Sequence, residues 1–103
     1  YELTRHRISN VLVRLTSTTA RVESYVCAIH LLPGGTQEMR FEGRYLDTLE
    51  KRDGRWALHY RQVVMDWSDT FAVTDSRDSE AFSALAKGCN NSHDPLYAHL
   101  AGD

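Results

Sequence analysis

Apolar and polar residues alternate along most of the first two thirds of the chain. From Leu3 to Leu15 the period is two and β-branched residues are frequent, which predicts a strand. A second run of this kind, Ala20 to His30, follows the polar turn Thr16–Thr19. In the first run the alternation places Ile8, Asn10 and Leu12 on one face, and Val11, Val13 and Leu15 on the other.

Two further runs flank the pair Asp53-Gly54, and glycine accepts the positive φ that a tight hairpin turn needs. We expect strands over 41–52 and 55–67, with Asp66 and Trp67 ending the fourth. The segment Leu32–Thr36 contains a proline and two glycines and therefore separates the second and third strands. Short reversals cannot join parallel neighbours, so the four strands are expected to form an antiparallel meander.

Beyond the fourth strand the composition becomes helical. The segment Asp78–Lys87, closed by Gly88, predicts a helix whose apolar side chains cover one flank of the sheet. Asp94 followed by Pro95 predicts a cap and a last helical turn. The expected fold class is α+β, in a single domain spanning 1–103, with a sheet over 3–67 and a helical tail over 76–103.

Composition limits the function classes. The 103 residues allow one domain, and a net charge of -2 gives no basic footprint for nucleic acid or an anionic membrane. Because no apolar run reaches the roughly 20 residues of a membrane span, we expect a soluble chain. Cys27 and Cys89 lack metal-site spacing and indicate reduced thiols in a cytoplasm. The five histidines form no ligand cluster, so no metal site is expected.

Two histidines lie at facing ends of the first two strands. Pairing about a turn near Ser17 and Thr18 brings His6 toward His30. An odd number of loop residues opposes the two imidazoles directly, whereas an even number shifts the register by one and separates them. Such a pair can act as general acid and base, because imidazole ordinarily titrates near pH 6.5. The alternative is two separate strand-end histidines near solvent.

The hairpin supplies the other candidates. If Arg52-Asp53-Gly54 is a three-residue loop, Tyr45 lies opposite Arg61 on one face. An arginine among apolar residues needs a partner, which Asp47 or an anionic substrate oxygen would provide. Tyr45 is either a hydrogen-bond donor to a ligand or a core tyrosine bonded to the backbone. Arg61 is accordingly either a structural residue or a substrate anchor.

The order of motifs resembles that of SnoaL-like domains of the nuclear transport factor 2-like superfamily, of the scytalone dehydratase and polyketide cyclase type. The matching segments are Arg5–Asn10, Gly43–Asp47, Asp53–Trp56, His59–Arg61 and Asp66-Trp67. The resemblance implies a cone-shaped, cystatin-like fold with a curved sheet, and N-terminal helices that we expect to be missing here. It also implies that His6 is the pocket acid/base, that His30 is the second polar pocket residue, and that Tyr45 stands where the dehydratase type has asparagine.

We therefore expect a cofactor-independent acid/base lyase or isomerase that acts on a small apolar oxygenated molecule. His6, His30 and Tyr45 are the catalytic candidates, and the substrate-binding candidates are Arg61, Asn10, Asp47 and Trp67. The alternative is a non-catalytic domain that binds a small ligand or serves as an accessory or oligomerisation subunit. Apolar residues on both sheet faces suggest a homo-oligomer formed through the sheet.

Overall fold

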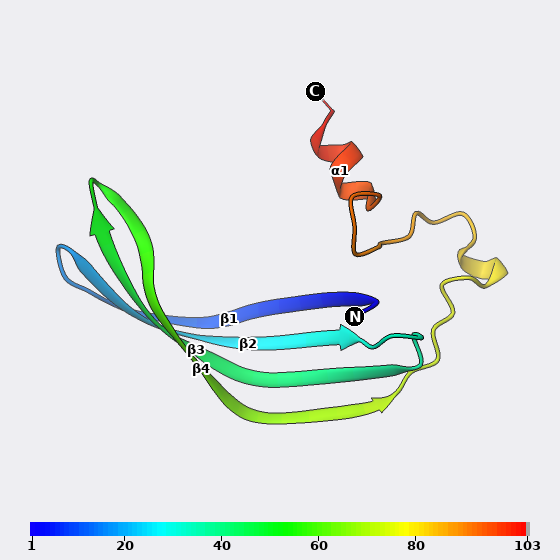
Figure 1. Ribbon diagram of the computed structural model, residues 1–103, viewed down its shortest axis with the longest axis horizontal. Coiled ribbons are helices and arrows are strands. Elements are labelled where there is room, and N and C mark those ends of the chain that lie inside the picture. Colours follow the sequence, from blue (N-terminus) through cyan, green and yellow to red (C-terminus); the bar gives the residue numbers. More distant parts are fainter. Residues whose placement is uncertain (103) are drawn as a thin grey trace. The chain divides into compact units, whose positions relative to one another are not determined.

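The computed structural model describes residues 1–102, which form one four-stranded sheet followed by a mostly irregular tail (Figure 1). The strands are β1 (Leu3–Leu15), β2 (Thr19–Leu31), β3 (Gln37–Arg52) and β4 (Arg55–Ala72). Their order in the sheet is β1-β2-β3-β4, so each strand pairs with the next one along the chain. The predicted antiparallel meander is confirmed.

The connections are as short as the sequence suggested, but two strands are longer than expected, because β3 begins at Gln37 instead of Phe41 and β4 extends beyond Trp67. Gly34 and Gly35 both have positive φ in the turn between β2 and β3, which Leu32 closes by donating to the Gln37 carbonyl at 2.9 Å. The prediction that β4 ends at Trp67 is wrong, because the strand continues to Ala72. Val73 just beyond it still donates to the Thr36 carbonyl at 3.0 Å.

Packing divides the chain into two compact units. The first, here the terminal unit, contains Tyr1–Arg5, Ile29–Met39 and the chain from Thr70 onward. The second, here the central unit, contains His6–Ala28 and Arg40–Asp69.

The tail of the terminal unit corrects one prediction and confirms another. Instead of a helix over 78–87 there is a single 3₁₀ turn, η1 (Glu80–Phe82), and Phe82 and Leu85 are 45% and 62% exposed. A helix this short is marginal unless its apolar face packs, and these side chains do not cover a sheet. Helix α1 (Pro95–Leu100) begins as expected, because the Asp94 carboxylate accepts a hydrogen bond from the Leu96 N–H at 2.9 Å.

Neither helix within residues 1–102 has the length and apolar character needed to cross a membrane.

The central unit has a small core and a large exposed apolar surface. Ala20, Val26 and Ala28 of β2 are buried, as is the polar Ser24. By contrast, Trp56, Met65 and Trp67 of β4 are 43%, 61% and 61% exposed. The inner strand β2 thus supplies this core, while the edge strand β4 leaves apolar side chains uncovered.

Contacts across the strands define the two faces of the central unit. Cys27 donates to Glu42, and Arg44 contacts Glu23 and Asp66, each at 3.4 Å. These five residues define what we call the Cys27 face. Since successive side chains of a strand point to opposite faces, the residues between them lie on the other side, which we call the Val26 face. The Val26 face includes Val26, Ala28, Tyr45 and Asp47.

Candidate functional site

The strongest polar arrangement on the Val26 face joins β3 to β4. The Arg61 guanidinium donates from Nε to Asp47 Oδ1 at 2.8 Å and from Nη2 to Asp47 Oδ2 at 3.0 Å. Its Cζ also lies 3.9 Å from the centroid of the Tyr45 ring. The Asp47 side chain is only 8% exposed and that of Arg61 is 41% exposed. The buried carboxylate and the ring thus fix the orientation of a guanidinium that reaches solvent.

The hydrogen bonds to Asp47 raise the pKa of the Arg61 guanidinium above its ordinary value. The side chain therefore stays cationic across the range in which enzymes work. Of its five N–H donors, Asp47 takes two, and the others have no hydrogen bond within residues 1–102. The Tyr45 hydroxyl likewise has no hydrogen-bond partner within that range. The alternative of a tyrosine whose hydroxyl is bonded to the backbone is therefore wrong.

The turn that was expected to bring Tyr45 and Arg61 together is not the one found. β3 ends at Arg52 and β4 begins at Arg55, so the turn has two residues, Asp53 and Gly54, with φ of 51° and 77°. This is the type I′ pattern, and the predicted three-residue loop is wrong. A regular ladder continued from a two-residue turn would place Tyr45 and Arg61 on opposite faces.

Their contact therefore requires the alternation to shift by one residue, as in a β-bulge. The contact of His59 with Glu50 still follows the register set by the turn, so the shift lies between these residues and the Arg61–Asp47 pair. The apolar positions of β4 shift at the same place. They are the even positions Trp56, Leu58 and Tyr60 before it, and the odd positions Val63, Met65 and Trp67 after it.

A similar irregularity orients His6. The Thr16 N–H donates to the Thr19 carbonyl, and Glu2 pairs with Leu31 in the same way, both at 2.8 Å. Between these two pairs β1 has two more residues than β2, and Asn10 has a positive φ of 49°. Asn10 thus marks a bulge, and the regular alternation predicted for this strand is wrong there.

One added residue reverses the alternation and a second one restores it, so the reversed stretch of β1 extends only from Asn10 to the second added residue. The charge of Arg7 acts on Cys27, as expected if Arg7 lies in that stretch and points to the Cys27 face. Its neighbour His6 would then point to the Val26 face, with Tyr45 and Arg61. Trp67 joins them, because the preceding Asp66 contacts Arg44 on the Cys27 face.

The remaining candidates lie elsewhere. His30 belongs to the terminal unit, where its ring meets Tyr1 edge to face at a centroid distance of 4.2 Å. The hydrogen bond from the Thr16 N–H to the Thr19 carbonyl leaves two residues, Ser17 and Thr18, in the turn that closes this hairpin. This is the even case, in which the register set by the turn does not oppose His6 and His30 directly. Asn10 is exposed, and its positive φ forms part of the bulge in β1.

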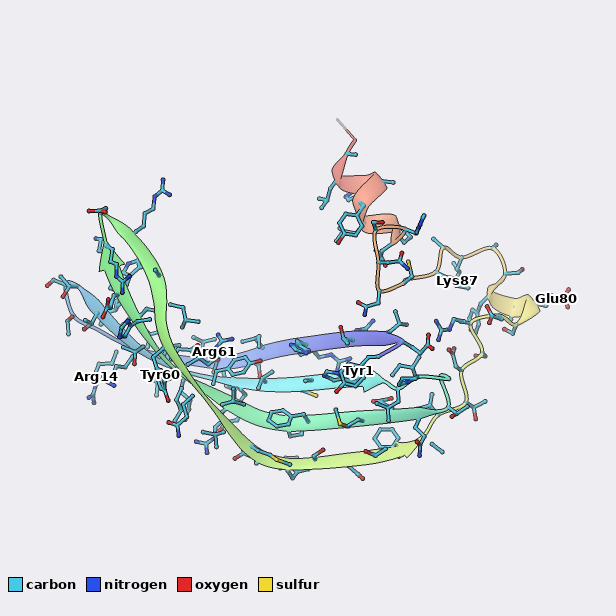
Figure 2. All side chains as sticks on the ribbon, in the orientation of Figure 1. Tyr1, Arg14, Tyr60, Arg61, Glu80 and Lys87 are labelled. Carbon is cyan, nitrogen blue, oxygen red and sulfur yellow. The ribbon has the colours of Figure 1, made fainter. Side chains whose placement is uncertain are left out.

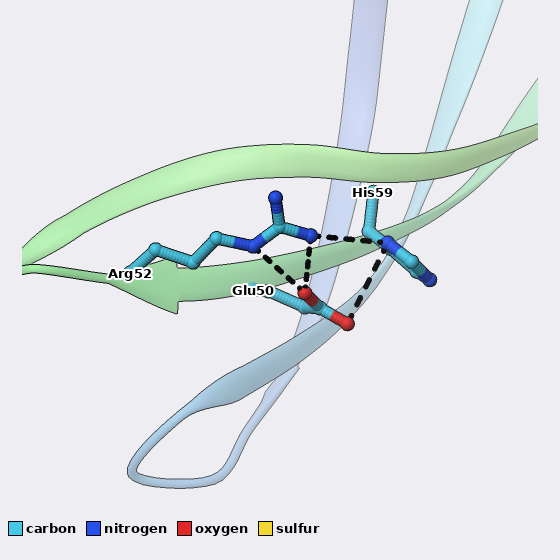
Figure 3. A network of polar contacts seen from close by, with 3 residues as sticks. All are labelled: Glu50, Arg52 and His59. Carbon is cyan, nitrogen blue, oxygen red and sulfur yellow. Dashed lines mark hydrogen bonds and ion pairs between the residues drawn. The ribbon is translucent and has the colours of Figure 1, made fainter.

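Two features of the central unit were not predicted as sites. Near the β3–β4 turn, Arg52 donates to Glu50 at 2.6 Å, and His59 Nδ1 lies 3.5 Å from the same carboxylate (Figure 3). The hydrogen bond from Arg52 lowers the pKa of Glu50, and this exposed network holds the end of the hairpin. The second feature is a recess of about 430 Å³ in the central unit, to which Arg14 and Tyr60 contribute (Figure 2).

Comparison with solved structures gives related folds. A putative scytalone dehydratase from Novosphingobium aromaticivorans DSM 12444 is 32% identical over 69% of this chain and 48% of its own, with a TM-score of 0.60. A variant of Rv3472, a protein of unknown function from Mycobacterium tuberculosis, is 26% identical over 63% of this chain and 38% of its own, with a TM-score of 0.55.

A hexachlorocyclohexane dehydrochlorinase (LinA) type 2 is 23% identical over 67% of this chain and 47% of its own, with a TM-score of 0.61, which shows a shared fold alone. This chain therefore spans less than half the length of these three proteins. No match was found among curated proteins.

The family comparison covers most of the sheet. The model of the SnoaL-like domain matches residues 1–62, a stretch that includes His6, Tyr45, Asp47 and Arg61 and ends before Trp67. More than half of the chain is matched, and the 32% identical solved structure covers more than two thirds of it. The chain therefore belongs to the SnoaL-like domain family of the nuclear transport factor 2-like superfamily.

Proposed function

We propose that this chain forms the catalytic wall of a cofactor-independent lyase of the dehydratase type, acting on a small, largely apolar molecule with a carbonyl and a β-hydroxyl. The observation that carries the proposal is the Arg61 guanidinium, which Asp47 and Tyr45 hold in one orientation while three of its five donors stay open. This cation lies among the exposed apolar side chains of β4. An apolar ligand with one oxygen to be polarised suits such a surface.

In the proposed reaction, His6 takes the proton from the carbon next to the substrate carbonyl. The electron pair of that C–H bond moves into the carbonyl, and the resulting enolate oxygen receives hydrogen bonds from Arg61 and Tyr45. The enolate then re-forms its carbonyl, a C=C bond forms, and the β C–O bond breaks. The hydroxide takes the proton back from His6 and leaves as water.

The family resemblance implies an assisting role for His30, and this role stays a prediction. A His30→Ala variant in the same assay tests it. Asp47 has a positioning role, because its carboxylate is occupied by Arg61. Trp67, 61% exposed on the Val26 face, is proposed to pack against the apolar body of the substrate.

The test is water elimination from a panel of cyclic β-hydroxy ketones, followed by the ultraviolet absorbance of the conjugated enone. We expect His6→Ala to reduce kcat by about a hundredfold or more, the usual size of a general-base contribution. His59→Ala is the matched control, because His59 lies in the network at the hairpin end and not on the Val26 face.

Arg61→Lys keeps the charge but cannot form the two parallel bonds to Asp47, and should reduce kcat more than it raises KM. Saturable binding of the panel with no turnover in the unmodified protein would instead support the ligand-binding alternative. Equal turnover by the unmodified protein and His6→Ala would refute the proposed role of His6.

A further inference from the structure

The recess to which Arg14 and Tyr60 contribute belongs entirely to the central unit, and none of the proposed catalytic residues His6, Tyr45 and Arg61 lines it. It has a volume of about 430 Å³. Its lining comes from all four strands: Leu12, Arg14, Arg21, Val22, Glu23, Leu46, Asp47, Thr48, Tyr60 and Gln62. A recess of this size fits the range of small-molecule sites, about 300 to 1,000 Å³.

Two of its arginines face one another across the β1–β2 hairpin. The pair formed by Thr16 and Thr19 sets the register of this hairpin, and counting back from it places Arg14 directly opposite Arg21. Both side chains line the same recess, which agrees with that register. Like charges in directly opposite positions destabilise a sheet, so this arrangement has a cost unless an anion lies between them.

No residue of the described chain provides that anion. Within residues 1–102, neither the Arg14 nor the Arg21 guanidinium forms an ion pair or a hydrogen bond. The two carboxylates of the recess are both engaged, Glu23 by Arg44 at 3.4 Å and Asp47 by Arg61 at 2.8 Å. The unbalanced charge of the recess is therefore positive.

The rest of the lining is apolar or neutral. Leu12, Val22 and Leu46 provide aliphatic surface, and Leu12 is 68% exposed. Thr48 and Gln62 add neutral hydrogen-bonding groups. An exposed arginine is solvated by bulk water and needs no aliphatic residues near it. An organic anion with an aliphatic body, by contrast, can contact both the cationic and the aliphatic surface of the recess.

We propose that this recess is a second ligand site, which binds a small organic carboxylate with an aliphatic body. The carboxylate lies between the Arg14 and Arg21 guanidinium groups, each of which can donate two parallel N–H bonds to it. The aliphatic body lies on Leu12, Val22 and Leu46. The site shares Asp47 with the arrangement around Arg61, but it does not depend on the elimination chemistry proposed above.

The experiment is calorimetric titration of octanoate into the full-length protein, with acetate as the probe that has the same charged group and no aliphatic body. We expect saturable one-to-one binding of octanoate, and binding of acetate that is weaker by about tenfold or more. Arg14→Gln and Arg21→Gln should each weaken octanoate binding by about tenfold, the effect of losing a charge-assisted hydrogen bond. Arg55→Gln is the matched control, because Arg55 is an exposed arginine of the same unit that does not line the recess.

The midpoint temperature of thermal unfolding without ligand gives a second readout. The loss of one positive charge elsewhere on the unit should not reproduce it. Removing either opposed arginine should raise the midpoint, and Arg55→Gln should leave it unchanged. His6→Ala should bind octanoate like the unmodified protein, so failure of the proposed catalysis and failure of this site are distinguishable. Equal octanoate affinities for Arg14→Gln, Arg21→Gln and Arg55→Gln would overturn the proposal, as would equal affinities for acetate and octanoate.

Discussion

The pair formed by Asp47 and Arg61 leads to an asymmetric prediction about stability. Asp47→Asn leaves a guanidinium that is already 41% exposed and can turn toward water, so we expect a loss of about 2 kcal/mol in the free energy of unfolding. Arg61→Met instead leaves a carboxylate that is 8% exposed without its partner, and should cost about 3 kcal/mol. For a domain of this size, 2 kcal/mol lowers the melting temperature by roughly 10 °C.

The double variant should cost about 3 kcal/mol, well below the two single losses combined, because neither charge is then left without its partner. Chemical unfolding followed by far-ultraviolet circular dichroism gives the three free energies. A coupling below about 0.5 kcal/mol would refute the claim that the two residues act as one unit.

Three further changes test the sheet. Gly43→Ala should destabilise the protein by about 2 kcal/mol or more in chemical unfolding, because a Cβ there would lie 2.2 Å from the Val64 carbonyl oxygen; an unchanged midpoint would contradict this close approach of β3 and β4. Asn10→Val should cost about 1 to 2 kcal/mol and Asn10→Gly should not, since the backbone there has a φ of 49°; equal midpoints would argue against the bulge. Burial and the hydrogen bond to Glu42 raise the pKa of the Cys27 thiol, so Glu42→Gln should speed its alkylation at pH 8, and an unchanged rate would contradict this cause.

The strands could be predicted because their signals are local. A period of two, an Asp-Gly turn and a Pro-Gly-Gly break each depend on a few adjacent residues, and all four strands were found in the expected order. The helix expected over 78–87 was wrong for the opposite reason. Its composition favours helix, but a segment of ten residues needs packing to stay helical, and Leu85 is 62% exposed.

The site was harder to predict because it depends on register. Counting from the turns alone puts Tyr45 and Arg61 on opposite faces once the turn has two residues, and it also misplaces His6. The bulges restore the shared face, and a bulge has no strong signature of its own in the sequence. Asn10 offered a hint, since asparagine tolerates positive φ better than most residues do.

The clearer signal is that, within one strand, the large apolar residues change from even to odd positions in the sequence. In β4 the large apolar residues occupy even positions up to Tyr60 and odd positions from Val63, which a regular strand with one buried face would not do. In β1 Ile8 is followed by Val11 and Val13, with the change at Asn10. Each change keeps the apolar side chains on one face only if the backbone adds a residue at that point. The added residue in β4 brings Arg61 to the Val26 face, and the one at Asn10 would bring His6 there, so the proposed catalytic surface depends on irregularities of the sheet.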